Sequence, residues 1–137
     1  MRALIALDWS EQAFAAVREV SYLYDLHEVI LVHGIDLGMF QYPIVAEVSN
    51  MQGYDDFRKA MEKAGEQLLD HTSTLLPSEG LSIARVCEFG KPASLILDKA
   101  RETHADLIVI GARGRGRVGE LVLGSVSHRV ALHADCT

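Results

Sequence analysis

The sequence predicts an α/β fold, with one domain over residues 1–137 that holds an open parallel sheet with helices on both faces. Short, almost wholly apolar runs alternate with amphipathic segments four times along the chain. Such runs are typical of parallel strands buried on both faces, and right-handed crossovers place helices on the two sides of the sheet. The composition, 49% hydrophobic and 23% charged, is that of a globular protein rather than a disordered one.

Charge, hydropathy and cysteine content exclude several classes of protein. A net charge of −6 argues against general binding to nucleic acid or to an anionic membrane. No apolar run reaches the roughly 18 residues that span a membrane, and Asp8 interrupts the N-terminal apolar run, so a secretory signal is not indicated. Two cysteines, Cys87 and Cys136, are too few for a disulfide scaffold, and the six histidines form no ligand cluster. We therefore expect a cytoplasmic protein with reduced thiols and no protein-built metal site.

The N-terminal part begins with an apolar strand over residues 2–7, and apolar residues then recur at helical spacing over residues 11–24. Asp8 and Ser10 lie between these elements, and either side chain can cap the helix. Asp8 also follows the carboxyl end of a strand, where open α/β sheets bind their ligands. The two roles of Asp8 are compatible.

A second strand is expected over residues 28–35, with His33 near its carboxyl end. A lone histidine at such a place is more often structural than catalytic. Residues 36–55 show no clear periodicity and predict a long connection, which is usually functional or disordered. Its apolar side chains leave open whether it packs over a ligand or a partner, or is a variable surface loop.

The C-terminal part continues the alternation. A helix begins at Phe57 and ends before Pro77, because proline cannot continue it. The next strand alternates imperfectly and contains Arg85, which is typical of a sheet edge. The remaining predicted elements are that edge strand over residues 81–89, a helix with a buried stripe over residues 93–100, a strand over residues 106–110 and a helix over residues 124–133.

The stretch after the last strand predicts an anion site. Gly111 opens a glycine- and arginine-rich loop that leads to Gly124 and the start of a helix. Glycine lets the backbone approach a phosphate, and the first turn of a helix offers unpaired N–H groups. The hydroxyls of Ser125 and Ser127 can donate to phosphate oxygens. The alternative is a plain βα connection whose glycines only make tight turns.

Two common nucleotide motifs match this stretch only in part. Gly114, Gly116 and Gly119 spell G-x-G-x-x-G, but they do not open a helix directly after a strand. Residues 119–125 spell G-x-x-x-x-G-S without the lysine of a P-loop. Neither motif explains the stretch.

A third spacing, G-x2-G-x9-G-S from Gly111 to Ser125, resembles the nucleotide-binding signature of the universal stress protein family. The likeness extends to the residues DWS after the first strand and to the segments VHGID, ADLIVIG and GSVSHRV. It implies strand order 3-2-1-4-5, with residues 8–10 beside residues 111–127 at the switch point of the sheet. The family's fifth strand, which commonly pairs two subunits, is missing after Asp135. We expect the exposed edge to be covered by a segment absent from the sequence or by a partner chain.

The resemblance also implies the ligand and the function. An adenine nucleotide, ATP with Mg²⁺ held largely by its phosphates, would bind in the crevice. Asp8 would meet the ribose side, and Gly34 would offer backbone groups to the adenine. The predicted nucleotide-binding residues are Asp8, Ser10, Gly34, Gly111, Arg113, Gly114, Gly124, Ser125, Val126 and Ser127.

We expect a regulatory protein of the stress response that forms a homodimer and acts through a further protein partner. An enzyme is not expected, because nothing at the phosphate end resembles the base that phosphoryl transfer needs. Two alternatives stay open. One is a dimeric protein-interaction module of the same fold that does not bind nucleotide, and the other is a slow ATP hydrolase.

Overall fold

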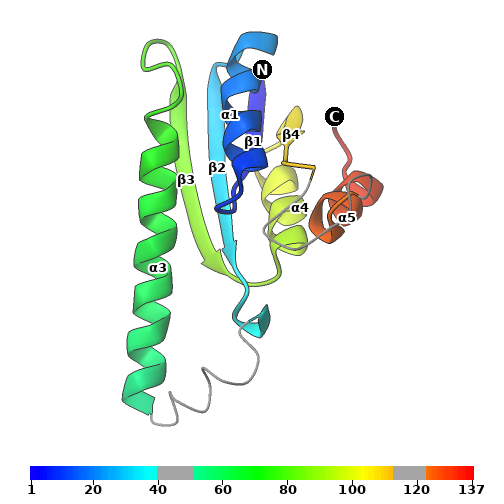
Figure 1. Ribbon diagram of the computed structural model, residues 1–137. Helices are drawn as coiled ribbons and strands as arrows, with labels where there is room; N and C mark the ends of the chain where they lie inside the picture. Colours follow the sequence, from blue (N-terminus) through cyan, green and yellow to red (C-terminus); the bar gives the residue numbers. More distant parts are fainter. Residues whose placement is uncertain (40–50, 113–122) are drawn as a thin grey trace.

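The computed structural model describes residues 1–39, 51–112 and 123–137. Its sheet lies between two layers of helices, with α1 and α3 on one face and α4 and α5 on the other (Figure 1). The elements in chain order are β1 (Arg2–Ala6), α1 (Glu11–Leu23), β2 (Glu28–Ile35), the 3-10 helix η1 (Leu37–Met39), α3 (Met51–Ser73), β3 (Ser82–Phe89), α4 (Pro92–Glu102), β4 (Leu107–Val109) and α5 (Ser125–His133).

The sheet has four parallel strands in the order β3-β2-β1-β4. The α/β class and the order of these four strands are confirmed. The described residues contain no fifth strand, but the last residue lies beside the outer edge of β4, where Ile108 N–H donates to the carbonyl of Thr137 at 2.7 Å. What completes this edge stays a prediction.

Alternation along the strands divides the core into two halves. Odd-numbered residues of β1, such as Ala3 and Ile5, face α1 and α3, whereas even-numbered residues, such as Leu4, face α4 and α5. All three side chains are fully buried. Both faces of the central strands are therefore apolar, which explains why these strands read as unbroken hydrophobic runs.

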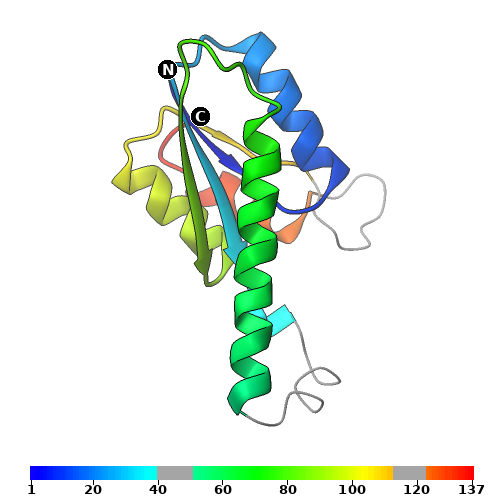
Figure 2. The same cartoon turned by 90° about the vertical axis from the view of Figure 1, so that its left-hand side faces the viewer.

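Helix α3 begins earlier than the sequence predicts. It includes residues 51–55, which we assigned to the long connection. The sequence pattern hides this start because Gly53 is a helix-breaking signal. Its N-terminal part extends beyond the carboxyl ends of β2 and β3 (Figures 1 and 2). Toward the other end of the helix, Asp70 forms an ion pair with Arg85 of β3, with Oδ1 3.3 Å from Nε. This contact accounts for the arginine on the edge strand.

Candidate functional site

The predicted site residues meet where β1 and β4 end. These strands are neighbours, with Ala3 opposite Leu107, so their carboxyl ends lie side by side. Asp8 follows the first strand and Gly111 follows the second. The described structure therefore brings together two stretches about a hundred residues apart, as the switch-point argument predicts.

Asp8 and Ser10 form a hydrogen-bonded turn that starts α1. The Ser10 backbone N–H donates to Oδ1 of Asp8 at 3.0 Å, and the Ser10 hydroxyl donates to the same oxygen. The Ser10 hydroxyl in turn accepts the N–H of Ala13 at 3.2 Å, so Ser10 is the N-cap of the helix. Of the two capping candidates, Ser10 caps the helix, and its two bonds to Asp8 fix that carboxylate at the end of β1.

Gly111 lies against the first turn of α1. A Cβ atom added at Gly111 would lie 3.1 Å from the backbone nitrogen of Ala13 and 3.2 Å from the carbonyl carbon of Gln12. Only a residue without a side chain fits this approach without displacing the helix. This packing supplies a structural reason for the glycine, besides the approach to a ligand that the sequence suggests.

The first turn of α5 is tied to the same place. The Ser127 hydroxyl donates to the carbonyl of Gly111 at 2.7 Å, and Gly124 N–H donates to the carbonyl of Ala112 at 2.7 Å. Gly124 is the N-cap of α5, and the first turn of this helix contains no acidic residue. Its N–H groups and partial positive charge are therefore not countered by a carboxylate of the same turn.

Gly34 directs its backbone groups to the side of β2 that faces β1. The carbonyl of Val32 accepts the N–H of Leu7, the residue after β1, and alternation turns the backbone of Gly34 to the same side, beyond the end of β1. A Cβ atom added at Gly34 would lie 3.1 Å from Cα of Pro92 in α4. Close packing of α4 thus explains why this position holds no apolar side chain.

His33 has a structural partner. Its Nδ1 is 2.8 Å from the carbonyl oxygen of Leu7, the residue before Asp8. The imidazole therefore joins β2 to the end of β1 by a side-chain hydrogen bond. This contact agrees with the structural interpretation of the histidine.

A family model described as "Universal stress protein family" matches residues 1–137. The chain belongs to the universal stress protein family.

Individual relatives agree with this assignment. Universal stress protein YxiE of Bacillus subtilis (strain 168) is 34% identical over 82 residues, which are 60% of this chain and 55% of that protein, so the match spans about half of the relative. The solved hypothetical protein MJ0577 is 25% identical with a TM-score of 0.80, over 98% of this chain and 90% of that one. A universal stress protein family protein from Arabidopsis thaliana, solved with AMP bound, is 19% identical with a TM-score of 0.63, over 100% of this chain and 88% of that one. This likeness shows the shared fold.

Two predicted site residues of this universal stress protein, Arg113 and Gly114, lie outside the described residues, as does most of the signature spacing. Trp9 stands between Asp8 and Ser10 and is 42% exposed, but it is not among the residues predicted from the sequence. Its place within the capping turn is the signal that could have drawn attention to it. Trp9 is the single tryptophan of the chain, so its fluorescence reports on this end of the sheet.

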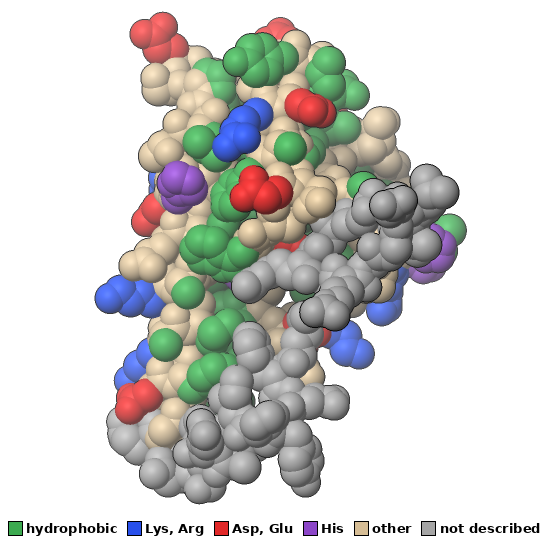
Figure 3. Space-filling view, in the orientation of Figure 1, with side chains coloured by type: hydrophobic (Ala, Val, Ile, Leu, Met, Phe, Trp, Pro, Cys, Tyr) green, Lys and Arg blue, Asp and Glu red, His purple; other side chains and the backbone are tan. Residues whose placement is uncertain are grey.

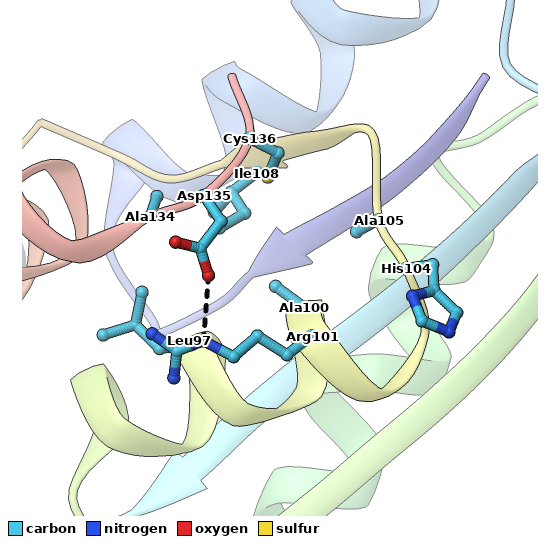
Figure 4. Close-up of a pocket in the computed structure, with 9 residues that line it drawn as sticks. All are labelled: Leu97, Ala100, Arg101, His104, Ala105, Ile108, Ala134, Asp135 and Cys136. Carbon is cyan, nitrogen blue, oxygen red and sulfur yellow. Dashed lines mark hydrogen bonds and ion pairs between the residues drawn. The ribbon is translucent and has the colours of Figure 1, made fainter.

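The universal stress protein also has a cavity of about 460 Å³ between α4, β4 and the C-terminal segment (Figure 4). Arg101 and Asp135 face each other across it, with Nε 3.0 Å from Oδ2. None of the predicted nucleotide-site residues that the structure describes lines this cavity. Its lining is Leu97, Ala100, Arg101, His104, Ala105, Ile108, Ala134, Asp135 and Cys136.

Two absences hold over residues 1–39, 51–112 and 123–137, the ranges that the structure describes. In these ranges no group of three or more His, Cys, Asp or Glu side chains is placed to hold a metal ion. Over the same part of the chain, no helix has both the length and the apolar character needed to cross a membrane.

Proposed function

We propose that this universal stress protein binds an adenine nucleotide, ATP being the expected ligand, and acts as a stress-response regulatory protein. The observation that carries the proposal is the position of Gly111, which lies between the first turn of α1 and Ser127 of α5. Two strand ends and two helix N-termini thereby meet at one place. Helix N-termini favour anions, and open parallel sheets bind ligands at this edge.

The charges of the two helices suggest how the nucleotide lies. Helix α1 carries Glu11 in its first turn, whereas α5 carries no acidic residue there. We therefore place the phosphates, with any Mg²⁺ they carry, at residues 124–127 and the ribose near Asp8. The backbone of Gly34 would meet the adenine. The AMP bound to the Arabidopsis relative supports this class of ligand for the fold.

Regulation rather than turnover is proposed because phosphoryl transfer needs a placed base or a water-orienting group. Asp8 is the carboxylate that directly follows the end of β1, and its Oδ1 already accepts two hydrogen bonds from Ser10. Phosphate release measured with ATP in excess over protein should be slow. Fast release over many turnovers would favour the hydrolase alternative.

The first experiment denatures freshly purified protein and identifies any released nucleotide by chromatography and mass spectrometry. Near-stoichiometric ATP would support the proposal. Protein stripped of ligand should then show a rise in melting temperature with Mg-ATP, together with a change in Trp9 fluorescence. Protein that releases no nucleotide and shows neither response would refute the proposed function.

Two variants connect binding to the site. Gly124→Val should abolish binding, because a branched side chain at the buried N-cap of α5 obstructs the phosphates. Asp8→Asn should weaken binding, since a neutral amide bonds the ribose hydroxyls less strongly than a carboxylate. Asp25→Asn is the matched control, because it removes an exposed carboxylate just after α1, at the opposite end of that helix from Asp8. Equal affinities for all four proteins would contradict the site assignment.

A second candidate, a dimeric protein-interaction module, is favoured by exposed side chains at the end of α1. Tyr22, Leu23 and Tyr24 are 89%, 70% and 39% exposed, and hydrophobic side chains gather near the top of this view (Figure 3). A dimer measured by light scattering that dissociates in Leu23→Ser would support this use of the surface. Such a result together with an absence of nucleotide binding would make this module the better description.

A further inference from the structure

We propose that Ser127 is a positioning residue of the nucleotide crevice, whose hydroxyl holds Gly111 in place instead of binding a phosphate oxygen. The inference rests on the proposed function, because it assigns a role within the same crevice. It reverses the role that the sequence suggests for this hydroxyl. The observations behind it are the burial of Ser127, which is 5% exposed, and its 2.7 Å hydrogen bond to the carbonyl of Gly111.

A serine hydroxyl has one proton to donate. Phosphate oxygens without protons are acceptors, so a serine that binds one must donate to it. The Ser127 proton is directed at Gly111, and moving it to a phosphate would leave that carbonyl without this donor. An unpaired buried acceptor costs free energy, so the internal bond competes with any bond to ligand.

The internal bond fixes both sides of the crevice. Two successive carbonyls after β4, those of Gly111 and Ala112, accept from the first turn of α5 through the Ser127 hydroxyl and the Gly124 N–H. Gly111 is also packed against Ala13 of α1. Loss of the hydroxyl would therefore let the end of β4 shift relative to two helix N-termini, which changes the position of Gly111 relative to Asp8 and to the first turn of α5.

Ser125 provides an internal contrast within the same turn. Its side chain is exposed, whereas Ser127 is buried two residues later. A hydroxyl on the exposed side can turn toward a phosphate without breaking the bond to Gly111. The structure thus assigns different roles to the two serines that the sequence treats alike.

The test compares Ser127→Ala, Ser127→Thr and Ser125→Ala, with affinities for Mg-ATP and adenosine measured by calorimetry. Ser127→Ala should weaken the binding of both ligands by a similar factor, about tenfold, because the end of β4, beside the proposed ribose position at Asp8, is displaced. Ser127→Thr should bind both ligands with affinities near those of wild type, because it keeps the hydroxyl. Ser125→Ala should weaken Mg-ATP and leave adenosine unchanged. Ser21→Ala, which removes a serine bond of 3.0 Å to the Arg18 carbonyl on α1, is the control for serine loss and should bind both ligands normally.

Hydrogen exchange of the ligand-free protein gives a readout without nucleotide. The amide of Gly124 should exchange about tenfold faster in Ser127→Ala than in wild type or Ser21→Ala, because its bond to Ala112 is held in the same turn. Selective loss of Mg-ATP affinity in Ser127→Ala, with adenosine unchanged, would overturn the inference and make Ser127 a phosphate ligand. Unchanged affinities and unchanged exchange would also overturn it. A wild type that binds neither ligand would refute the proposed function, and Gly124 exchange would then decide the structural part alone.

Discussion

Substitution of Gly65 by alanine should destabilise the protein, although alanine is the better helix former. Gly65 is buried on α3 where the helix crosses β2 and β3. A Cβ atom there would lie 2.5 Å from Sγ of Cys87 and 2.9 Å from Cδ2 of His33. Favourable carbon contacts lie at roughly 3.5–4.0 Å, so at least one partner must move.

The expected loss follows from two opposed terms. Overpacking a core costs about 1–3 kcal/mol. The upper end of this range applies because the added Cβ would overlap two side chains, those of Cys87 and His33. His33 resists movement, since its Nδ1 is 2.8 Å from the Leu7 carbonyl. Replacing glycine by alanine inside a helix contributes about 1 kcal/mol of stability. The net expectation is a loss of about 2 kcal/mol in the free energy of unfolding.

Urea denaturation followed by circular dichroism measures this loss. Repeating Gly65→Ala in a Cys87→Ala background should reduce the cost to about 1 kcal/mol or less, because the nearest clash is gone. Ala60→Gly, at an exposed position of α3, measures the helix-propensity term separately. If Gly65→Ala is neutral, or costs the same with and without the Cys87 sulfur, the packing argument is wrong.

Three further predictions concern single side chains. Ser10→Ala should lower the free energy of unfolding by about 1 kcal/mol through loss of the helix cap, as measured by urea denaturation; a stability equal to wild type would contradict the cap. Gly34→Val should lower it by about 1–3 kcal/mol, because the side chain meets Pro92, and an unchanged melting temperature would argue against that contact. Burial, followed by the carboxylates of Glu66 and Glu62, raises the pKa of the Cys87 thiol. The neutral thiol therefore contributes stability at neutral pH that is lost as the pH rises through the folded-state pKa. Wild type should lose more stability than Cys87→Ala in alkaline buffer, and parallel pH profiles would show that the thiol does not matter.

Local and periodic features were predictable from the sequence. The buried strands were predictable as apolar runs, as in residues 2–7, because both faces of the sheet are covered. A helix cap at Asp8 or Ser10 was predictable from position, and the structure assigns it to Ser10. The early start of α3 was missed because propensity rules treat Gly53 as a break, whereas the structure continues the helix through it.

Contacts between distant residues were not predictable in the same way. The absence of a side chain at Gly34 depends on Pro92, and that at Gly65 depends on Cys87. Each pair meets only when a helix has crossed the sheet. The internal use of the Ser127 hydroxyl is of the same kind, because its partner Gly111 lies 16 residues earlier in the chain. Sequence spacing places Gly111 and Ser127 near one another, but it does not show which of their groups form a hydrogen bond.

The central position of β1 has a consequence for the order in which the chain folds. One edge pairs with β2, with Arg2 opposite Glu28, but the other waits for β4, with Ala3 opposite Leu107. During synthesis the first strand therefore exposes an apolar edge until about a hundred further residues have been made, a state prone to aggregation. The proposed ligand crevice lies between β1 and β4, so it is assembled only when this last pairing closes. Nucleotide capture would then distinguish finished chains from immature ones.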